Sequence, residues 1–183
     1  CCLRPLQIRR GTMIESLIEQ SFSGTTPMDS LARLGMAVFL GGVIGYERAL
    51  HAQTAGLRTH ILIALASCLF ALLAFEILAR FDDETADPLR LIEAVTSGVA
   101  FLAAGSIIMA GDRVVGLTTG AGMWLAGAIG LACGIGALAL AVMATLIVLP
   151  VLWVLRRVSH KLENRLASEA DEKPVDKHNG DTA

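Results

Sequence analysis

The stretch Ile61–Ala79, ILIALASCLFALLAFEILA, is apolar throughout apart from Ser67 and Glu76. A helix needs about 20 apolar residues to cross the hydrocarbon core of a bilayer. Backbone N–H and C=O groups find no water there, so a crossing segment must pair them internally as a helix. A β-barrel strand would alternate apolar and polar residues, and this stretch does not. It therefore predicts a transmembrane helix.

Four further apolar segments predict helices of similar length. They are Leu31–Gly45 continuing to about Leu50, about Ile92–Ala110, about Leu117–Cys133, and Ile135–Leu155. The chain is 54% hydrophobic and 17% charged, with a mean hydropathy of +0.62, whereas soluble domains have about 45–50% apolar and about 25% charged residues. We therefore expect an all-α, polytopic membrane helix bundle with about five transmembrane helices.

The polar parts of the chain divide it into three regions. Residues 1–30 form an N-terminal extension, in which residues 1–12 do not resemble a native start because Met13 is a better one. Residues 31–158 form the transmembrane domain. Residues 159–183 are rich in charge and poor in apolar side chains, which predicts a cytoplasmic tail with a short helix followed by disorder.

The distribution of Lys and Arg near the helix ends predicts the orientation, because these residues are retained on the cytoplasmic side. One side carries Arg48, Arg58, Arg113, Arg156, Arg157, Lys161 and Arg165, and the other carries Arg33, Arg80 and Arg90. We expect the first side to be cytoplasmic. Five crossings then place the N-terminus outside and the C-terminus in the cytoplasm.

The segment Gly41–Arg48, GGVIGYER, ends the first helix with two features. Gly41 and Gly45 lie on one face and allow another helix to approach closely. Glu47 and Arg48 follow at the cytoplasmic end, and because sequence neighbours do not face each other on a helix, one of them should point into the bundle. Ionisable residues bordering the hydrocarbon are candidates for a functional site.

The segment Ala55–His60, AGLRTH, opens the second helix. We expect Gly56 to permit the turn and Thr59 to be the helix N-cap. Two interpretations of Arg58 remain open: it pairs with Glu47, which we favour, or it holds an anion with the free N–H groups of the helix start.

Other polar and small residues in the apolar segments are predicted to be structural. We expect His51 and His60 to be cytoplasmic loop residues rather than ligands, and Glu76 to reach the outer membrane interface. The segment Ser97–Ser106, SGVAFLAAGS, predicts a tight helix-packing surface.

The segment Val115–Gly120, VGLTTG, opens the fourth helix and echoes Gly-Leu-Arg-Thr with Gly-Leu-Thr-Thr. We call these two helix starts, Gly-Leu-Arg-Thr and Gly-Leu-Thr-Thr, the two corners. If the first two helices match the third and fourth as a parallel repeat, both corners lie on the cytoplasmic side. Duplicated transporters place sites between such halves. Chance similarity remains the alternative.

The sequence carries no signature of catalysis. It lacks a Gly-Lys-Ser/Thr phosphate loop, paired catalytic carboxylates and a Ser/His/Asp arrangement. Cys68 and Cys133 are expected to be small buried residues, and the four cysteines lack metal-site spacing. No basic stripe indicates nucleic acid. We expect no enzyme activity, no cofactor and no bound metal.

Four motifs together resemble the MgtC/SapB family of bacterial inner-membrane proteins. They are GGVIGYER at Gly41–Arg48, AGLRTH at Ala55–His60, DPLRLIEAVTSGVAFLAAGSI at Asp87–Ile107, and GLTTGAGMWLAGAIGLACGIG at Gly116–Gly136. The resemblance implies five helices, a cytoplasmic C-terminus and a role in growth at low magnesium and in survival inside macrophages. It also implies that such proteins modulate membrane partners, notably the F-type ATP synthase, rather than pump magnesium.

The resemblance also implies a set of functional residues. They are Glu47, Arg48, Gly56, Arg58, Thr59, Asp87, Arg90, Gly98, Gly105, Gly116, Thr118 and Thr119. Ala100 and Ala103 depart from the glycines common in the family, and the archetype's folded cytoplasmic domain is not recognisable here.

These features leave two main hypotheses for function. The first is a regulator that binds membrane partners, with the glycine-rich helices also allowing a homo-oligomer. The second is a transporter of Mg²⁺ or another small ion. Magnesium prefers oxygen ligands, usually carboxylates, and Glu47 and Glu76 lie toward opposite ends of the apolar segments. We therefore favour the regulator, and an enzyme acting on lipid or phosphate least.

Overall fold

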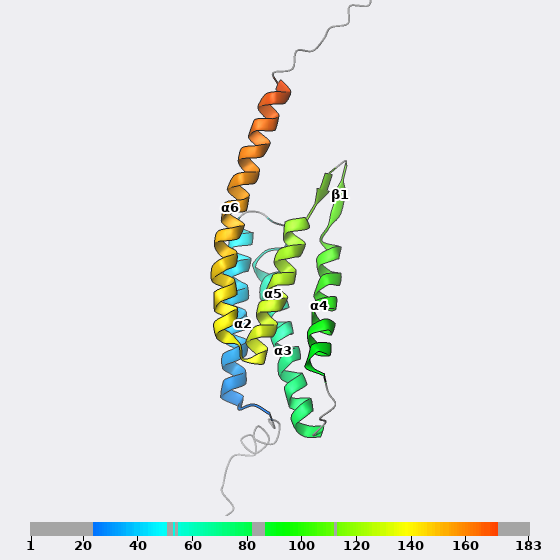
Figure 1. Ribbon diagram of the computed structural model, residues 1–183, viewed down its shortest axis with the longest axis vertical. Helices are drawn as coiled ribbons and strands as arrows, with labels where there is room; N and C mark the ends of the chain where they lie inside the picture. The colour runs from blue at the N-terminus through cyan, green and yellow to red at the C-terminus, as the bar shows by residue number, and fades with distance from the viewer. Residues whose placement is uncertain (1–23, 51–52, 54, 82–86, 112, 172–183) are drawn as a thin grey trace, which may run out of the picture. The chain divides into compact units, whose positions relative to one another are not determined.

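The computed structural model describes residues 24–50, 53, 55–81, 87–111 and 113–171 (Figure 1). These residues form five α-helices and one β-hairpin, in the order α2 (Pro27–Ala49), α3 (Leu57–Phe81), α4 (Pro88–Gly105), β1 (Ile108–Ala110), β2 (Arg113–Val115), α5 (Leu117–Ile135) and α6 (Leu138–Asp171). The chain divides into two compact units, residues 1–145 and residues 146–183, with the boundary inside α6.

All five predicted helices are present, so the mostly helical membrane bundle is confirmed. Three of them, α2, α3 and α5, are long and apolar enough to cross a membrane, and α6 contributes a shorter apolar stretch, Leu138–Val154. The exact number of crossings stays a prediction. The polar tail is helical as far as Asp171, and residues 172–183 lie outside the described part of the chain.

One helix is shorter than predicted, and the fold is not purely helical. α4 ends at Gly105, where the Ser106 hydroxyl donates to the Ala103 carbonyl at 2.7 Å. Residues predicted to continue it instead pair in an antiparallel hairpin, with Ile108 opposite Val115 and Ala110 opposite Arg113. Gly111, at φ +64°, lies in the connection between the strands.

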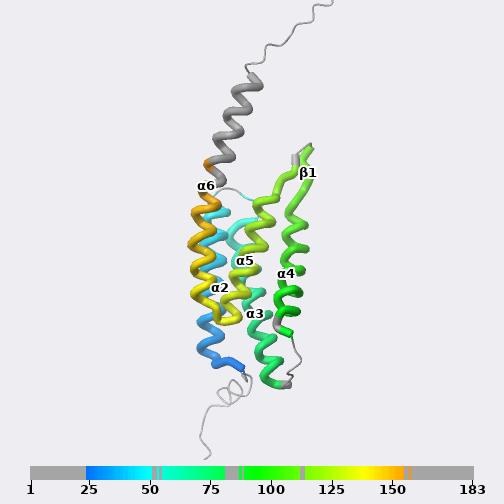
Figure 2. The backbone as a smooth tube through the Cα atoms, viewed as in Figure 1, coloured from blue at the N-terminus to red at the C-terminus, as the bar shows by residue number. Residues whose placement is uncertain are grey.

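The four helices α2, α3, α4 and α5 run alternately up and down (Figure 2). The turn between α2 and α3 and the hairpin between α4 and α5 therefore lie at the same end of this unit. α4 starts at Pro88, where Asp87 is the N-cap and its side chain accepts from the Leu89 N–H at 2.9 Å.

α3 packs against α2 and α5 through backbone surfaces without side chains. A Cβ added to Gly41 of α2 would lie 2.8 Å from the Ala64 Cβ, and one added to Gly45 would lie 2.8 Å from the Leu57 Cα. On α5, a Cβ at Gly130 would overlap the Ala64 carbonyl oxygen. The close approach predicted for Gly41 and Gly45 is confirmed.

The packing surface predicted at Ser97–Ser106 is present on one face of α4 only. A Cβ at Gly98 or Gly105 would meet no atom within 4 Å, and Phe101 is 80% exposed. α4 instead buries Val99 and Ala103, which face Gly127 and Gly120 of α5. The close approach comes from glycines on α5, and Gly98 and Gly105 of α4 lie away from this contact.

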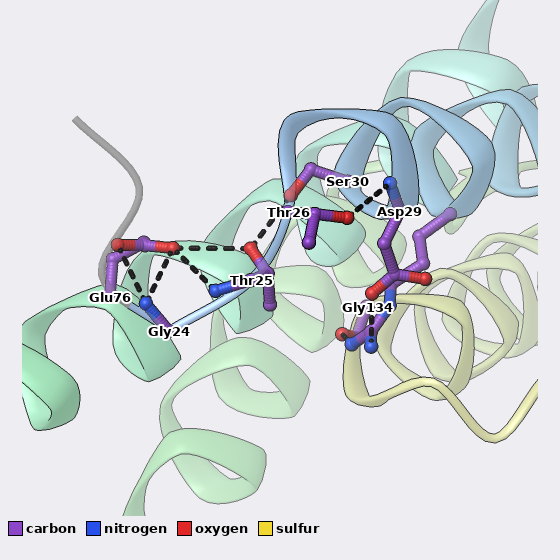
Figure 3. A network of polar contacts seen from close by, with 8 residues as sticks. Gly24, Thr25, Thr26, Asp29, Ser30, Glu76 and Gly134 are labelled. Carbon is purple, nitrogen blue, oxygen red and sulfur yellow. Dashed lines mark hydrogen bonds and ion pairs between the residues drawn. The ribbon is translucent and has the colours of Figure 1, made fainter. Parts of the chain in front are cut away.

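Polar contacts hold together the end of the unit that lies opposite the α2–α3 turn and the hairpin (Figure 3). The Glu76 carboxylate of α3 accepts from the backbone N–H groups of Gly24 and Thr25 at 3.3 and 3.1 Å and from the Thr25 hydroxyl at 3.1 Å. Arg33 of α2 donates to the Gly134 carbonyl at 2.8 Å. Glu76 therefore joins the chain before α2 to α3, a structural role.

Cys68 and Cys133 are fully buried free thiols in the core of the unit, as predicted. Beyond residue 145, α6 continues through Pro150, and the Arg157 guanidinium lies 4.4 Å from the centre of the Trp153 ring.

We predict that Gly130→Ala lowers the thermal stability of the purified protein, because the added methyl meets the backbone of α3, which cannot rotate away. Overpacking of this kind costs about 1–3 kcal/mol. Gly35→Ala is the matched control, since its Cβ would meet nothing within 4 Å. Equal melting temperatures for the two variants in detergent would contradict the packing described here.

Candidate functional site

A buried polar cluster lies where α2 ends and where α3 and α5 begin. Arg48 of α2, His60 of α3 and Thr119 of α5 are 7%, 0% and 1% exposed. Burial of ionisable groups is costly, so such side chains mark candidate functional sites in membrane proteins. We define these three residues, with Gln53 from the turn before α3, as the polar cluster.

Gln53 connects the end of α2 to the start of α5 by hydrogen bonds. Its side-chain oxygen accepts from Arg48 Nη2 at 3.4 Å and from the Thr119 hydroxyl at 3.3 Å. Its backbone N–H donates to the Arg48 carbonyl at 3.4 Å. The Gly-Leu-Thr-Thr corner is thus joined to the end of α2 and to the turn that precedes Gly-Leu-Arg-Thr, through the Gln53 side chain.

Arg48 is the member of the Glu47–Arg48 pair that points into the bundle. Its side chain is buried, whereas Glu47 is half-buried. The expectation that one of these neighbours points into the bundle is confirmed for Arg48, and one carboxylate oxygen of Glu47 is buried as well.

His60 is not a loop residue, contrary to prediction. α3 begins at Leu57, four residues before the apolar run at Ile61, so His60 lies in its first turn and is fully buried. Gly45 of α2 makes room, because a Cβ there would lie 3.0 Å from the His60 Cβ. The ring nitrogen Nδ1 bonds the Gly56 carbonyl at 2.9 Å. His51 lies outside the described residues.

The early start of α3 also changes the predicted roles of its neighbours. Thr59 lies inside the first turn and is not the N-cap, since Gly56 directly precedes the helix. Gly56 does not adopt a positive φ. Arg58 is exposed, and the described part of the chain shows no ion pair between it and Glu47.

The second corner requires its glycine. Gly116 has φ +92°, a conformation that side-chain-bearing residues rarely adopt, and a Cβ there would overlap the Ser106 carbonyl oxygen. Thr118 beside it is exposed, whereas Thr119 is buried. The two corners therefore differ in backbone conformation, and the parallel repeat stays a prediction.

The remaining predicted residues lie away from the polar cluster. Asp87 and Arg90 are at the start of α4, the opposite end of the unit, and both are exposed. Gly98 and Gly105 lie on the open side of α4. Of the twelve residues that the resemblance implied, Arg48 and Thr119 belong to the cluster, and Glu47 and Gly56 adjoin it.

Sequence reasoning missed Gln53, His60 and Gly122. His60 had a usable signal, because it follows Gly56 by four residues and ends the quoted motif. Gly122 lies beside His60, since a Cβ there would be 3.1 Å from His60 Nε2, but it is one of several glycines in α5 and nothing in the sequence shows which of them faces His60. Gln53 lies in a polar turn, where a buried contact has no sequence pattern.

The cluster is poorly suited to hold a divalent cation. Arg48 brings a permanent positive charge into it, and Mg²⁺ requires oxygen ligands, usually carboxylates. No group of three or more His, Cys, Asp or Glu side chains placed to hold a metal occurs among the described residues. The arrangement instead connects α2 and α5 by hydrogen bonds from Arg48 and Thr119 to Gln53.

Comparisons with known proteins place this chain among membrane proteins of one family. The family model described as the MgtC family matches residues 34–161. The chain is 36% identical over 138 residues to the putative magnesium transporter YhiD of Escherichia coli strain K12, covering 74% of this chain and 64% of the relative.

Two more relatives are similar over the same region. The identity is 38% over 132 residues with protein MgtC of Brucella abortus strain 2308, covering 72% of this chain and 53% of the relative. It is 41% over 112 residues with protein SapB of Bacillus subtilis strain 168, covering 59% and 48%. The chain thus spans about half to two thirds of these relatives. No solved structure matches it significantly.

We predict that Gln53→Ala destabilises the protein, because Arg48 and Thr119 both lose their shared acceptor. An unpaired buried donor costs about 1–3 kcal/mol, and partial exposure of Gln53 places the effect near the lower value. Gln53→Glu keeps the accepting oxygen and should melt at or above the wild-type temperature. Equal losses in the two variants would contradict this role.

Proposed function

Because the chain belongs to the MgtC family, we propose that it is a magnesium-related, multi-pass protein of the bacterial inner membrane that acts by binding other membrane proteins. Apolar helices and the family support the membrane location, and the name of the Escherichia coli relative supports the link to magnesium. We propose regulation of partners rather than conduction of ions because of a groove in the surface of the unit.

The observation that carries this proposal is an apolar groove between α3 and α4. It has a volume of about 790 Å³ and is bordered by Leu62, Phe70 and Leu73 of α3 and by Leu91, Gly98 and Leu102 of α4. Helices associate in lipid by close packing, which small residues favour. A groove with Gly98 in its wall is suited to a transmembrane helix of another protein.

The charges of the unit argue against a magnesium path. The buried Arg48 guanidinium repels a divalent cation at one end. Glu76 at the other end accepts hydrogen bonds from Gly24 and Thr25. The groove itself is lined almost entirely by apolar side chains, which provide no oxygen ligands in place of the hydration shell of the ion.

Transport of Mg²⁺ or another small ion is the second candidate. It is favoured by the name of the Escherichia coli relative, a putative magnesium transporter. The partners we propose for the first candidate are the F-type ATP synthase, as the family resemblance implies, or a second copy of this chain. A role in adaptation to low magnesium or in intracellular survival belongs to the same proposal.

We also propose five crossings, with the N-terminus outside and the C-terminus in the cytoplasm. The Lys and Arg bias supports this orientation, since Arg48, Arg58 and Arg113 all lie at or beside the end that carries the two corners. Reporter fusions after Gln53 and after Gly111 should both read as cytoplasmic. Readings on opposite faces of the membrane would overturn the topology.

We predict that Gly98→Leu abolishes growth support at low magnesium while the protein accumulates normally in the membrane. The leucine Cβ meets nothing within 4 Å at this position, so the larger side chain occupies groove volume without displacing the backbone. Gly35→Leu on α2 is the matched control, with equally open surroundings outside the groove. Normal growth with Gly98→Leu would contradict the role of the groove.

Purified protein in proteoliposomes separates the two candidate functions. We expect no Mg²⁺ flux above that of empty liposomes, together with a membrane partner that crosslinks to the wild-type protein and not to Gly98→Leu. Mg²⁺ flux through the wild-type protein that is lost in Glu47→Gln would contradict the regulatory function and support transport.

A further inference from the structure

Two buried nitrogen atoms in the polar cluster have no hydrogen-bond partner among the described residues. They are Nε of Arg48 and Nε2 of His60. The side chains that carry them are 7% and 0% exposed. A buried polar atom left unpaired lowers stability, so the pair needs a physical explanation.

The hydrogen bond of the His60 ring fixes what each nitrogen requires. Nδ1 lies 2.9 Å from the Gly56 carbonyl oxygen, which can only accept, so the proton of the neutral ring is on Nδ1. Nε2 then presents a lone pair and requires a donor. Arg48 Nε carries a hydrogen and requires an acceptor. The two requirements are complementary, yet the atoms do not bond each other.

Both nitrogens border the same point beside Gly122 of α5. A Cβ added to Gly122 would lie 3.1 Å from His60 Nε2 and 3.7 Å from Arg48 Nε. A side chain at this position would therefore crowd both nitrogens, and glycine leaves them uncovered on this side.

We propose that the two nitrogens beside Gly122 bind a single water molecule, which accepts from Arg48 Nε and donates to His60 Nε2. Water satisfies both requirements at once and needs two to four polar partners to remain buried. A halide would oppose the His60 lone pair, and a metal ion would oppose the Arg48 charge. The charged or titratable groups around the site are Glu47 and Arg48 from α2 and His60 from α3, while α5 contributes the uncharged Thr119 and Gly122.

The water would also account for glycine at position 122. At Gly130 an added Cβ would meet the backbone of another helix, whereas at Gly122 it would meet only polar side-chain atoms. The water would join α2 to α3 at the point where α5 begins and hold the His60 ring in one tautomer. This site is independent of the proposed regulatory function, because it concerns the interior of one unit and needs no partner.

Solid-state NMR on protein labelled with ¹⁵N-histidine in lipid bilayers tests the site, with His60→Gln assigning the signal. We expect a neutral His60 ring protonated on Nδ1, and a water cross-peak at Nε2. Gly122→Ala should remove that cross-peak, whereas Gly35→Ala should keep it.

Either of two results with the wild-type protein overturns the proposal: a proton on Nε2 of the neutral ring, or a buried Nε2 without contact to water. Should Gly122→Ala fold and keep the cross-peak, the water would lie elsewhere and the proposed position would be wrong. The wild-type spectrum decides the matter even if that variant does not fold.

Discussion

Direct contact between helix backbones on two sides of α3 is the constraint on which the membrane unit depends. In lipid no hydrophobic force drives one helix onto another, so close packing and hydrogen bonds must do so. Ala64 shows the constraint most clearly, because Gly41 of α2 and Gly130 of α5 both face it without side chains. Gly45 and Gly134 extend the same contacts toward the two ends.

The close approach at the α2–α3 end also determines the polar cluster. Because Gly45 lies against His60 and Leu57, α2 ends beside the first turn of α3, and the next inward-facing position is Arg48. The start of α5 then brings Thr119 within reach of Gln53. The side chains of Arg48, His60 and Thr119 are thus buried inside the unit, while the groove between α3 and α4 is lined by apolar side chains.

The sequence predicts this arrangement where spacing alone carries the information. Gly41 and Gly45 are four residues apart and must share a helix face, and the sequence neighbours Glu47 and Arg48 do not face each other, so one of them is expected to point into the bundle. Composition could not predict the hairpin, because an apolar run such as Ile107–Ala110 fits helix and strand equally. It also could not place Gly98 and Gly105, since small residues do not show which side of a helix meets a neighbour.

Thiol crosslinking between positions 53 and 119 tests most directly whether the two corners meet over the buried cluster. Gln53→Cys and Thr119→Cys are combined in a chain whose own cysteines are replaced, and native membranes are treated with a short bifunctional maleimide. The contact between Gln53 and Thr119 predicts an efficient crosslink within one chain. Free thiols at both positions that label singly but never join would contradict it.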